Sequence, residues 1–175
     1  MKNSDVKITP TGPCAGTQSG VFTCTGENIY IKWSRDIGTC DFEIKSEFKV
    51  DLVDKTAIGF VLWSGETKML LGLDGDGNKL FYKLQMGGLG SDGPHFLGPT
   101  NLNPDKFQTI VIIRREGKLK ISVDGEAWND ISFPRSIDAV GWRPWRNTIN
   151  IKDLVQIVDK GNININIKRL NLTLI

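Results

Sequence analysis

The stretch from Asp41 to Leu52 reads DFEIKSEFKVDL, and it decides the fold class of this sequence. Charged residues occupy every second position, and the positions between them hold Phe42, Ile44, Ser46, Phe48, Val50 and Leu52. Successive side chains of a strand point to opposite faces of its sheet, whereas a helix would spread these charges around its whole circumference. The stretch therefore predicts a long β-strand with one buried face and one wet face.

Shorter runs of strand character follow on both sides of this stretch. They are expected at Ile29–Trp33, Ala57–Trp63, Met69–Leu73, Lys79–Leu84, Phe107–Arg115, Lys118–Val123, Glu126–Phe133, Ile149–Val158 and Ile163–Leu174, the last with a bulge near Lys168. Asp-Gly pairs stand between several runs, and glycine tolerates the positive φ that a hairpin turn requires. No segment has a convincing amphipathic helix pattern. The sequence predicts an all-β fold, a two-sheet antiparallel β-sandwich.

The length of 175 residues fits one domain. We expect residues 1–175 to form a single β-sandwich domain in which residues 1–28, rich in Gly, Thr, Ser and Pro, are an irregular N-terminal lead-in. Residues 86–106 hold many glycines and prolines and read as a long connection. Connections longer than about 12–15 residues in a compact domain are usually functional or disordered.

Composition excludes several classes of protein. The formal net charge of +2 is too small to indicate nucleic-acid binding. No apolar stretch reaches the ~18 residues of a membrane-spanning helix. The polar segment Met1–Thr9 lacks the apolar core of a signal peptide, so the start fits an intracellular protein or a mature form with an added Met. The compartment stays open, with an extracellular or cell-surface location favoured, and so does the oligomeric state.

Three cysteines, Cys14, Cys24 and Cys40, lie in the first quarter of the chain. An odd number leaves at least one thiol unpaired or paired to another chain. Their spacing matches no zinc motif. A disulfide between Cys14 and Cys24 is one hypothesis, and three free thiols are the alternative.

Three segments resemble the concanavalin A-like lectin/glucanase superfamily, which includes laminin-G-like domains. They are DFEIKSEFKVDL followed by AIGFVLWS, then LLGLDGDGNKLFYKL, and then FQTIVIIRREGKLKISVDGEAWNDI. The resemblance runs from Cys40 to Val158, about two-thirds of the chain. It implies a jelly roll of two curved antiparallel sheets. Members often bind sugars on the concave sheet or on the loops at one rim, while others bind proteins or hydrolyse glycans.

Carboxylates in the arrangement of a glycan hydrolase are not evident. Hydrolases of this superfamily carry an E-x-D-x-x-E pattern, because one carboxyl group donates a proton while the other attacks or activates water. The nearest run, Asp41, Glu43 and Glu47, has a different spacing and is interpreted as the wet side of a strand. The sequence contains no nucleophile elbow that could act with the lone histidine, His95, so His95 is interpreted as a surface loop residue.

A calcium site is one interpretation of the segment DGDGN. Asp74, Asp76 and Asn78 alternate as the first ligands of a calcium loop do, but the sixth and twelfth positions, Lys79 and Gln85, do not fit an EF-hand. Laminin-G-like relatives bind calcium at loop aspartates, so a weaker site is conceivable on the resemblance. The alternative is a hairpin turn, in which these residue types serve the backbone. No other cofactor is expected.

The segment Gly141–Asn147, GWRPWRN, is the most unusual constellation. Exposing tryptophan is costly, so a pair of them in an expected loop needs an explanation. Aromatic rings stack on the C–H faces of sugars, and Arg and Asn bind hydroxyl, carboxylate or sulfate groups. The candidate ligand-binding residues are Trp142, Arg143, Trp145, Arg146, Asn147, His95 and Trp128, the last on an outward parity. The alternative is that Trp142 and Trp145 plug the end of the sandwich.

The sequence thus favours a non-catalytic, lectin-like domain that recognises a glycan or glycoprotein through loop aromatics and arginines. An acidic glycan is one candidate ligand. One alternative is a protein-interaction or adhesion domain of the laminin-G-like type. A second alternative is a glycan hydrolase of the glucanase branch, which would depend on Glu43 or Glu47.

Overall fold

The computed structural model describes residues 8–11, 14–16, 21–24, 30–50, 55–76, 79–87, 90–100, 103, 105–159 and 164–167. Its first sheet contains β1 (Ile8–Thr11), β4 (Tyr30–Gly38), β6 (Ala57–Ser64), β7 (Thr67–Asp74), β8 (Lys79–Met86), β9 (Gly90–Ser91), β10 (His95–Pro99) and β14 (Ile137–Trp145). Its second sheet contains β2 (Cys14–Gly16), β3 (Val21–Cys24), β5 (Asp41–Val50), β11 (Gln108–Arg115), β12 (Lys118–Val123), β13 (Glu126–Ser132), β15 (Asn147–Asp159) and β16 (Asn164–Ile167).

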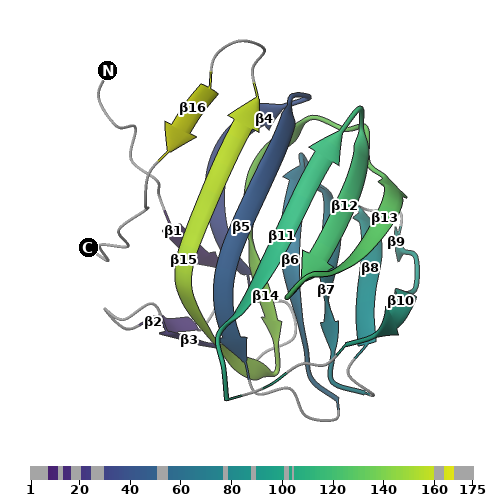
Figure 1. Cartoon of the computed structure of the whole chain (residues 1–175). Coiled ribbons are helices and arrows are strands. Elements are labelled where there is room, and N and C mark those ends of the chain that lie inside the picture. The colour runs from purple at the N-terminus through teal and green to yellow at the C-terminus, as the bar shows by residue number, and fades with distance from the viewer. Residues whose placement is uncertain are drawn as a thin grey trace.

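The two sheets lie face to face as the layers of a sandwich (Figure 1). The first sheet has the order β1-β4-β14-β6-β7-β8-β10, with β9 paired to β8. The second has the order β13-β12-β11-β5-β15-β3-β2, with β16 paired to β15. Every described pair of strands is antiparallel. The predicted all-β sandwich is therefore confirmed.

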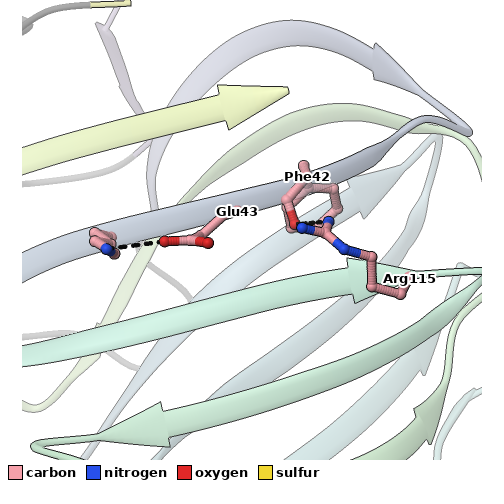
Figure 2. A network of polar contacts seen from close by, with 4 residues as sticks. Phe42, Glu43 and Arg115 are labelled. Carbon is pink, nitrogen blue, oxygen red and sulfur yellow. Dashed lines mark hydrogen bonds and ion pairs between the residues drawn. The ribbon is translucent and has the colours of Figure 1, made fainter. Parts of the chain in front are cut away.

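Strand β5 has the two faces that its alternation predicts. Its even-numbered residues, from Phe42 to Val50, are buried between the sheets. On the outer face, Lys45 Nζ lies 2.9 Å from Glu43 Oε1, and the neighbouring Arg115 donates to the Phe42 carbonyl oxygen at 3.3 Å (Figure 2). Glu43 therefore lies on the wet face of the second sheet.

The core fills the space between the two layers with aliphatic and aromatic side chains. Phe48 from the second sheet and Phe60 from the first both contact the Trp142 ring, at centroid distances of 5.0 and 5.2 Å. Trp142 is completely buried among them. Because a close-packed interior loses contacts whenever a large ring is removed, Trp142 is a main element of the core.

Strand β14 was not predicted, because the segment was expected to be a loop. Gly141 and Pro144 interrupt its sequence, and both residue types are unfavourable within strands. The register explains why they are tolerated. The pairing of β14 with β4 ends at Trp142, so at Pro144 the strand pairs with β6 alone and no ladder hydrogen bond to β4 is lost.

The expected irregular segments also contain strands. The lead-in holds β1, β2 and β3, and the long connection holds β9 and β10, which pair with β8. These strands are short and follow Gly- and Pro-rich sequence, so they form by pairing with an existing sheet rather than through their own alternation. The bulge predicted near Lys168 lies outside the described residues.

The backbone register places Cys14 directly opposite Cys24 on β2 and β3. Opposed Cα atoms of an antiparallel pair are about 4.5–5.5 Å apart, which is within the span of a disulfide. The Cys14–Cys24 bond stays a prediction, and Cys40 is a half-buried free thiol.

Over the part of the chain that the structure describes, there is no helix long and apolar enough to span a bilayer.

Candidate functional site

The outer face of the first sheet carries an apolar cluster of its own. Val61, Trp63, Leu70, Phe81 and Ala139 are buried there, and Tyr30 and Ala57 pack against them. Their neighbours along each strand, such as Leu62 and Leu71, belong to the core between the sheets. An antiparallel sheet commonly has a polar outer face, so a buried apolar cluster on this side sets the first sheet apart and makes the face a candidate site.

Contacts of Tyr30 show that this face is strongly curved. Tyr30 lies on β4, yet its ring is 5.7 Å from the Trp63 ring on β6 and its hydroxyl donates to Gln85 Oε1 on β8 at 3.4 Å. Strands β4 and β8 are four positions apart in the sheet, which would be about 19 Å if the sheet were flat. The sheet must therefore curl toward this side. We call this outer side of β4, β14, β6, β7, β8 and β10 the concave face.

Three glycines lie on neighbouring strands in the middle of the concave face, and all three are buried. They are Gly59 on β6, Gly72 on β7 and Gly141 on β14. A Cβ atom at Gly72 or Gly141 would lie 1.9 Å from a backbone carbonyl oxygen, so the close backbone approach there requires glycine. A Cβ atom at Gly59 would instead have its nearest neighbour at 3.5 Å, an ordinary contact.

Gly59 and Gly72 are direct cross-strand partners of each other, and their further partners on the neighbouring strands have cationic and aromatic side chains. The row runs, strand by strand, through Arg143, Gly59, Gly72, Phe81 and Phe96. Phe96 is half exposed, although large apolar side chains are usually covered. The two middle positions of the row therefore have no side chain of their own, with Arg143 on one side and two phenyl rings on the other. We call Gly59 and Gly72 the glycine floor.

Arg143 is held between two aromatic rings. Its guanidinium carbon lies 4.0 Å from the centroid of the Trp145 ring and 5.6 Å from that of Tyr30. Burial lowers the pKa of Arg143 from its ordinary value and the nearby Tyr30 opposes the shift, while burial raises the pKa of Tyr30 against the effect of Arg143. A guanidinium remains protonated at physiological pH even so. The site thus presents a permanent positive charge framed by aromatic surface.

The predicted ligand-binding segment divides between the core and the concave face. Trp142 points into the core and is completely buried, so it cannot contact a ligand, and its interpretation as a core plug fits the structure. Arg143 and Trp145, with the opposite parity, lie on the concave face. Arg146 is exposed in the following turn with φ of 57°, and Asn147 donates through Nδ2 to the Ala57 carbonyl oxygen at 3.2 Å.

The two remaining candidates lie elsewhere. His95 is exposed on β10, four strand positions from β14, and its ring stacks on Tyr82 at 4.7 Å. Trp128 belongs to β13 in the second sheet, and its side chain is outside the described set. The structure therefore brings Arg143 and Trp145 together but places neither His95 nor Trp128 beside them.

Sequence reasoning missed Tyr30, Phe81, Phe96 and the glycine floor. A signal was present, because Gly59 and Gly72 stand inside apolar strand runs, where glycine often marks close approach of another group. The turn aspartates, by contrast, serve the backbone: Asp74 Oδ1 accepts from Asp76 N at 2.8 Å, and Asp76 Oδ1 accepts from Lys55 N at 2.7 Å.

These bonds favour the hairpin-turn interpretation of the DGDGN segment over a calcium site. The third candidate ligand, Asn78, lies outside the described residues. Among the residues with described side chains, no three of His, Cys, Asp or Glu lie together in a way that could hold a metal ion.

Comparison with solved structures places this geometry among known folds. The carbohydrate-binding module CBM66 from Bacillus subtilis superposes with a TM-score of 0.67 at 16% identity, over 85% of this chain and 93% of that one. The chain has the concanavalin A-like jelly-roll fold. The Crh5 transglycosylase in complex with NAG matches this jelly roll with a TM-score of 0.65 at 16% identity, over 89% of this chain and 78% of that one.

A lectin shares the jelly roll as well. Galectin LEC-6 from Caenorhabditis elegans matches with a TM-score of 0.53 at 9% identity, over 78% of this chain and 99% of that one. No protein-family model and no curated protein matches the sequence. At these identities the similarity establishes the fold, and any shared function has to be argued from the residues of the concave face.

Proposed function

We propose that this jelly roll is a carbohydrate-binding domain that holds its glycan on the concave face, over the glycine floor. The observation that carries the proposal is the cross-strand row from Arg143 through Gly59 and Gly72 to Phe81 and Phe96. It combines two glycines, which have no side chains of their own, with a guanidinium group on one side and two phenyl rings on the other. Structural neighbours that are named as a carbohydrate-binding module and a galectin support the same class of function.

The side chains around the floor suit a sugar. A pyranose or furanose ring offers an apolar C–H face to an aromatic ring and hydroxyl groups at its edge. Trp145 supplies an aromatic face, and the Arg143 beneath it supplies N–H donors in a fixed plane. Because Arg143 is already ordered by two rings, little side-chain entropy is lost when it donates to a ligand.

Residue placement supports binding without hydrolysis. A glycosidase needs two carboxyl groups about 5–9.5 Å apart across the scissile bond. Among the described side chains, the register puts one carboxylate, Asp74, on the concave face, and its Oδ1 is engaged in its own turn. Glu43 lies on the outer face of the other sheet. Over the glycine floor, the described side chains therefore include no carboxylate pair of the kind that the hydrolase alternative needs.

Substituting Gly59 by valine tests the site. A Cβ atom there meets the Leu70 side chain at an ordinary contact distance of 3.5 Å and has no backbone atom among its three nearest neighbours, so the free energy of unfolding is expected to change by less than about 1 kcal/mol. The isopropyl group would fill the floor, and glycan affinity is expected to fall on the order of 100-fold, because a few misplaced atoms prevent the ring from reaching its partners. Isothermal titration calorimetry with the best ligand from a glycan array measures both binding constants.

Gly93→Val is the matched control. Gly93 has open space around its Cβ position and lies in the turn before β10, so the same chemical change there should leave affinity unaltered. Equal binding by wild type and Gly59→Val would place the ligand elsewhere. A wild-type protein that binds no glycan on the array would contradict the proposed function itself and favour the adhesion alternative.

A further inference from the structure

Positive charge converges on the concave face from four different strands. The described cations on this face are Lys32 on β4, Lys68 on β7, Lys79 and Lys83 on β8, and Arg143 on β14. Their cross-strand partners show the shared side, since Lys83 opposes Leu70 and Lys32 opposes Gly141. The formal net charge of the whole chain is only +2, so this concentration is local and not a consequence of a basic composition.

Aromatic rings hold most of these lysines in place. Lys32 Nζ lies 5.3 Å from the Trp63 ring centroid and Lys68 Nζ lies 5.5 Å from that of Tyr30. Lys79 Nζ lies 5.3 Å from the Phe96 ring. An ammonium group above a ring is attracted to it without giving up all its N–H donors. These lysines are therefore positioned while they keep donors for a further partner.

Carboxylates facing these cations are few in the described part of the chain. Asp74 is the cross-strand partner of Lys79, and its Oδ1 already accepts the backbone N–H of Asp76. The outer face of the second sheet differs, because its β5 lysines alternate with acids and Lys45 pairs with Glu43. Along β5 the cations of the second sheet thus lie among acids, whereas the described charges of the concave face are predominantly positive.

We propose that the glycan recognised on the concave face is anionic, carrying carboxylate or sulfate groups on its sugar rings. The inference rests on the proposed function and specifies its ligand class. The anionic groups of successive sugars would lie beside Lys68 and Lys83 on one side and beside Arg143 on the other, while the rings lie over the glycine floor. Guanidinium and ammonium donors form their strongest hydrogen bonds with such oxyanions.

The experiment compares matched polysaccharides by affinity gel electrophoresis and calorimetry. Polygalacturonate provides carboxylates, dextran sulfate provides sulfates, and dextran and galactan provide neutral chains. We expect at least one anionic polymer to bind on the order of 10-fold or more tightly than either neutral one, and its affinity to fall as salt rises, since exposed charge interactions are screened. The two anionic polymers distinguish carboxylate from sulfate recognition.

Charge-neutralising variants locate the binding face. Lys68→Gln with Lys83→Gln removes two positive charges from the concave face and is expected to weaken binding of the anionic polymer by roughly 10-fold, given the usual contribution of exposed charge pairs. Lys118→Gln with Lys120→Gln removes the same charge from β12 of the second sheet and should leave affinity within about 2-fold.

Each outcome bears on one of the two proposals. If a neutral polymer binds tightly and independently of salt while neither anionic polymer binds, the proposal of an anionic ligand is overturned and the proposal of carbohydrate binding is retained. Equal weakening by both double variants shows a nonspecific charge effect and overturns the assignment to the concave face. Absence of binding to every polysaccharide contradicts the proposed function.

Discussion

Replacing Trp142 by alanine is expected to lower the free energy of unfolding by about 3–5 kcal/mol, whereas Trp145→Ala is expected to lower it by less than about 1 kcal/mol. Trp142 is completely buried between Phe48 and Phe60, so truncation leaves a cavity that the two sheets cannot close. Trp145, three residues later, lies on the concave face and is only half-buried. One short segment therefore has a tryptophan that stabilises the core and another that we propose contacts the glycan.

Urea denaturation followed by far-ultraviolet circular dichroism gives both free energies, and calorimetry gives both affinities. Trp145→Ala is expected to weaken glycan binding on the order of 10-fold or more through the lost aromatic stacking surface. Trp142→Phe serves as the control, because it keeps a ring in the core and removes an indole N–H that has no protein partner. It should cost less than Trp142→Ala. Comparable instability of the Trp142 and Trp145 alanine variants would contradict the assigned burial.

Replacing Arg114 by methionine is expected to cost about 3–5 kcal/mol of unfolding free energy. Arg114 is 1% exposed, and it donates from Nε to the Cys40 carbonyl oxygen at 3.0 Å, from Nη1 to that of Arg135 at 2.8 Å and from Nη2 to that of Gly38 at 2.7 Å. Its guanidinium also lies 4.9 Å from the Phe42 ring centroid. Methionine fills a similar volume but leaves these buried carbonyl groups without a donor.

Arg115→Met is the matched control, because Arg115 is exposed and bonds only carbonyl groups on the rim of the same sheet. It should change the unfolding free energy by less than about 1 kcal/mol. Burial lowers the pKa of Arg114, with Asp41 and Cys40 opposing the shift, yet the guanidinium stays charged at any pH near neutrality. Similar losses in the two variants would indicate that the hydrogen bonds of Arg114 are not stabilising.

Apart from β2 and β3, which lie in the expected irregular lead-in, the strands of the second sheet could be predicted from their sequence, whereas β14 of the first sheet could not. In β5 and β12 one face is apolar and the other is charged, so alternation is visible and gives both the strand and its direction of burial. In β6 and β14 nearly every residue is buried on both faces, and the contrast between alternate residues disappears, so that β6 was recognised only as an apolar run. The concave face, on which the alternation of apolar and charged residues is lost, is also the face that we propose binds the ligand.

Residue chemistry alone made Arg143 and Trp145 candidates for ligand binding but could not separate them from Trp142. The separation depends on which parity of β14 faces the core, and that follows from pairing with β6 and not from any local feature. Each glycine of the floor had a local signal, but their pairing did not, because cross-strand register brings Gly59 opposite Gly72 across a hairpin. Long-range register is the information that a short sequence window lacks.

The most direct test of the account is a titration of the isotope-labelled protein with its glycan, followed by amide chemical shifts. We expect the largest changes in amide chemical shift at Gly59, Gly72 and Arg143, and we expect the amide shifts of β12 to stay unchanged. Changes concentrated on β12 and β11, with those of Gly59 and Gly72 unmoved, would contradict the account.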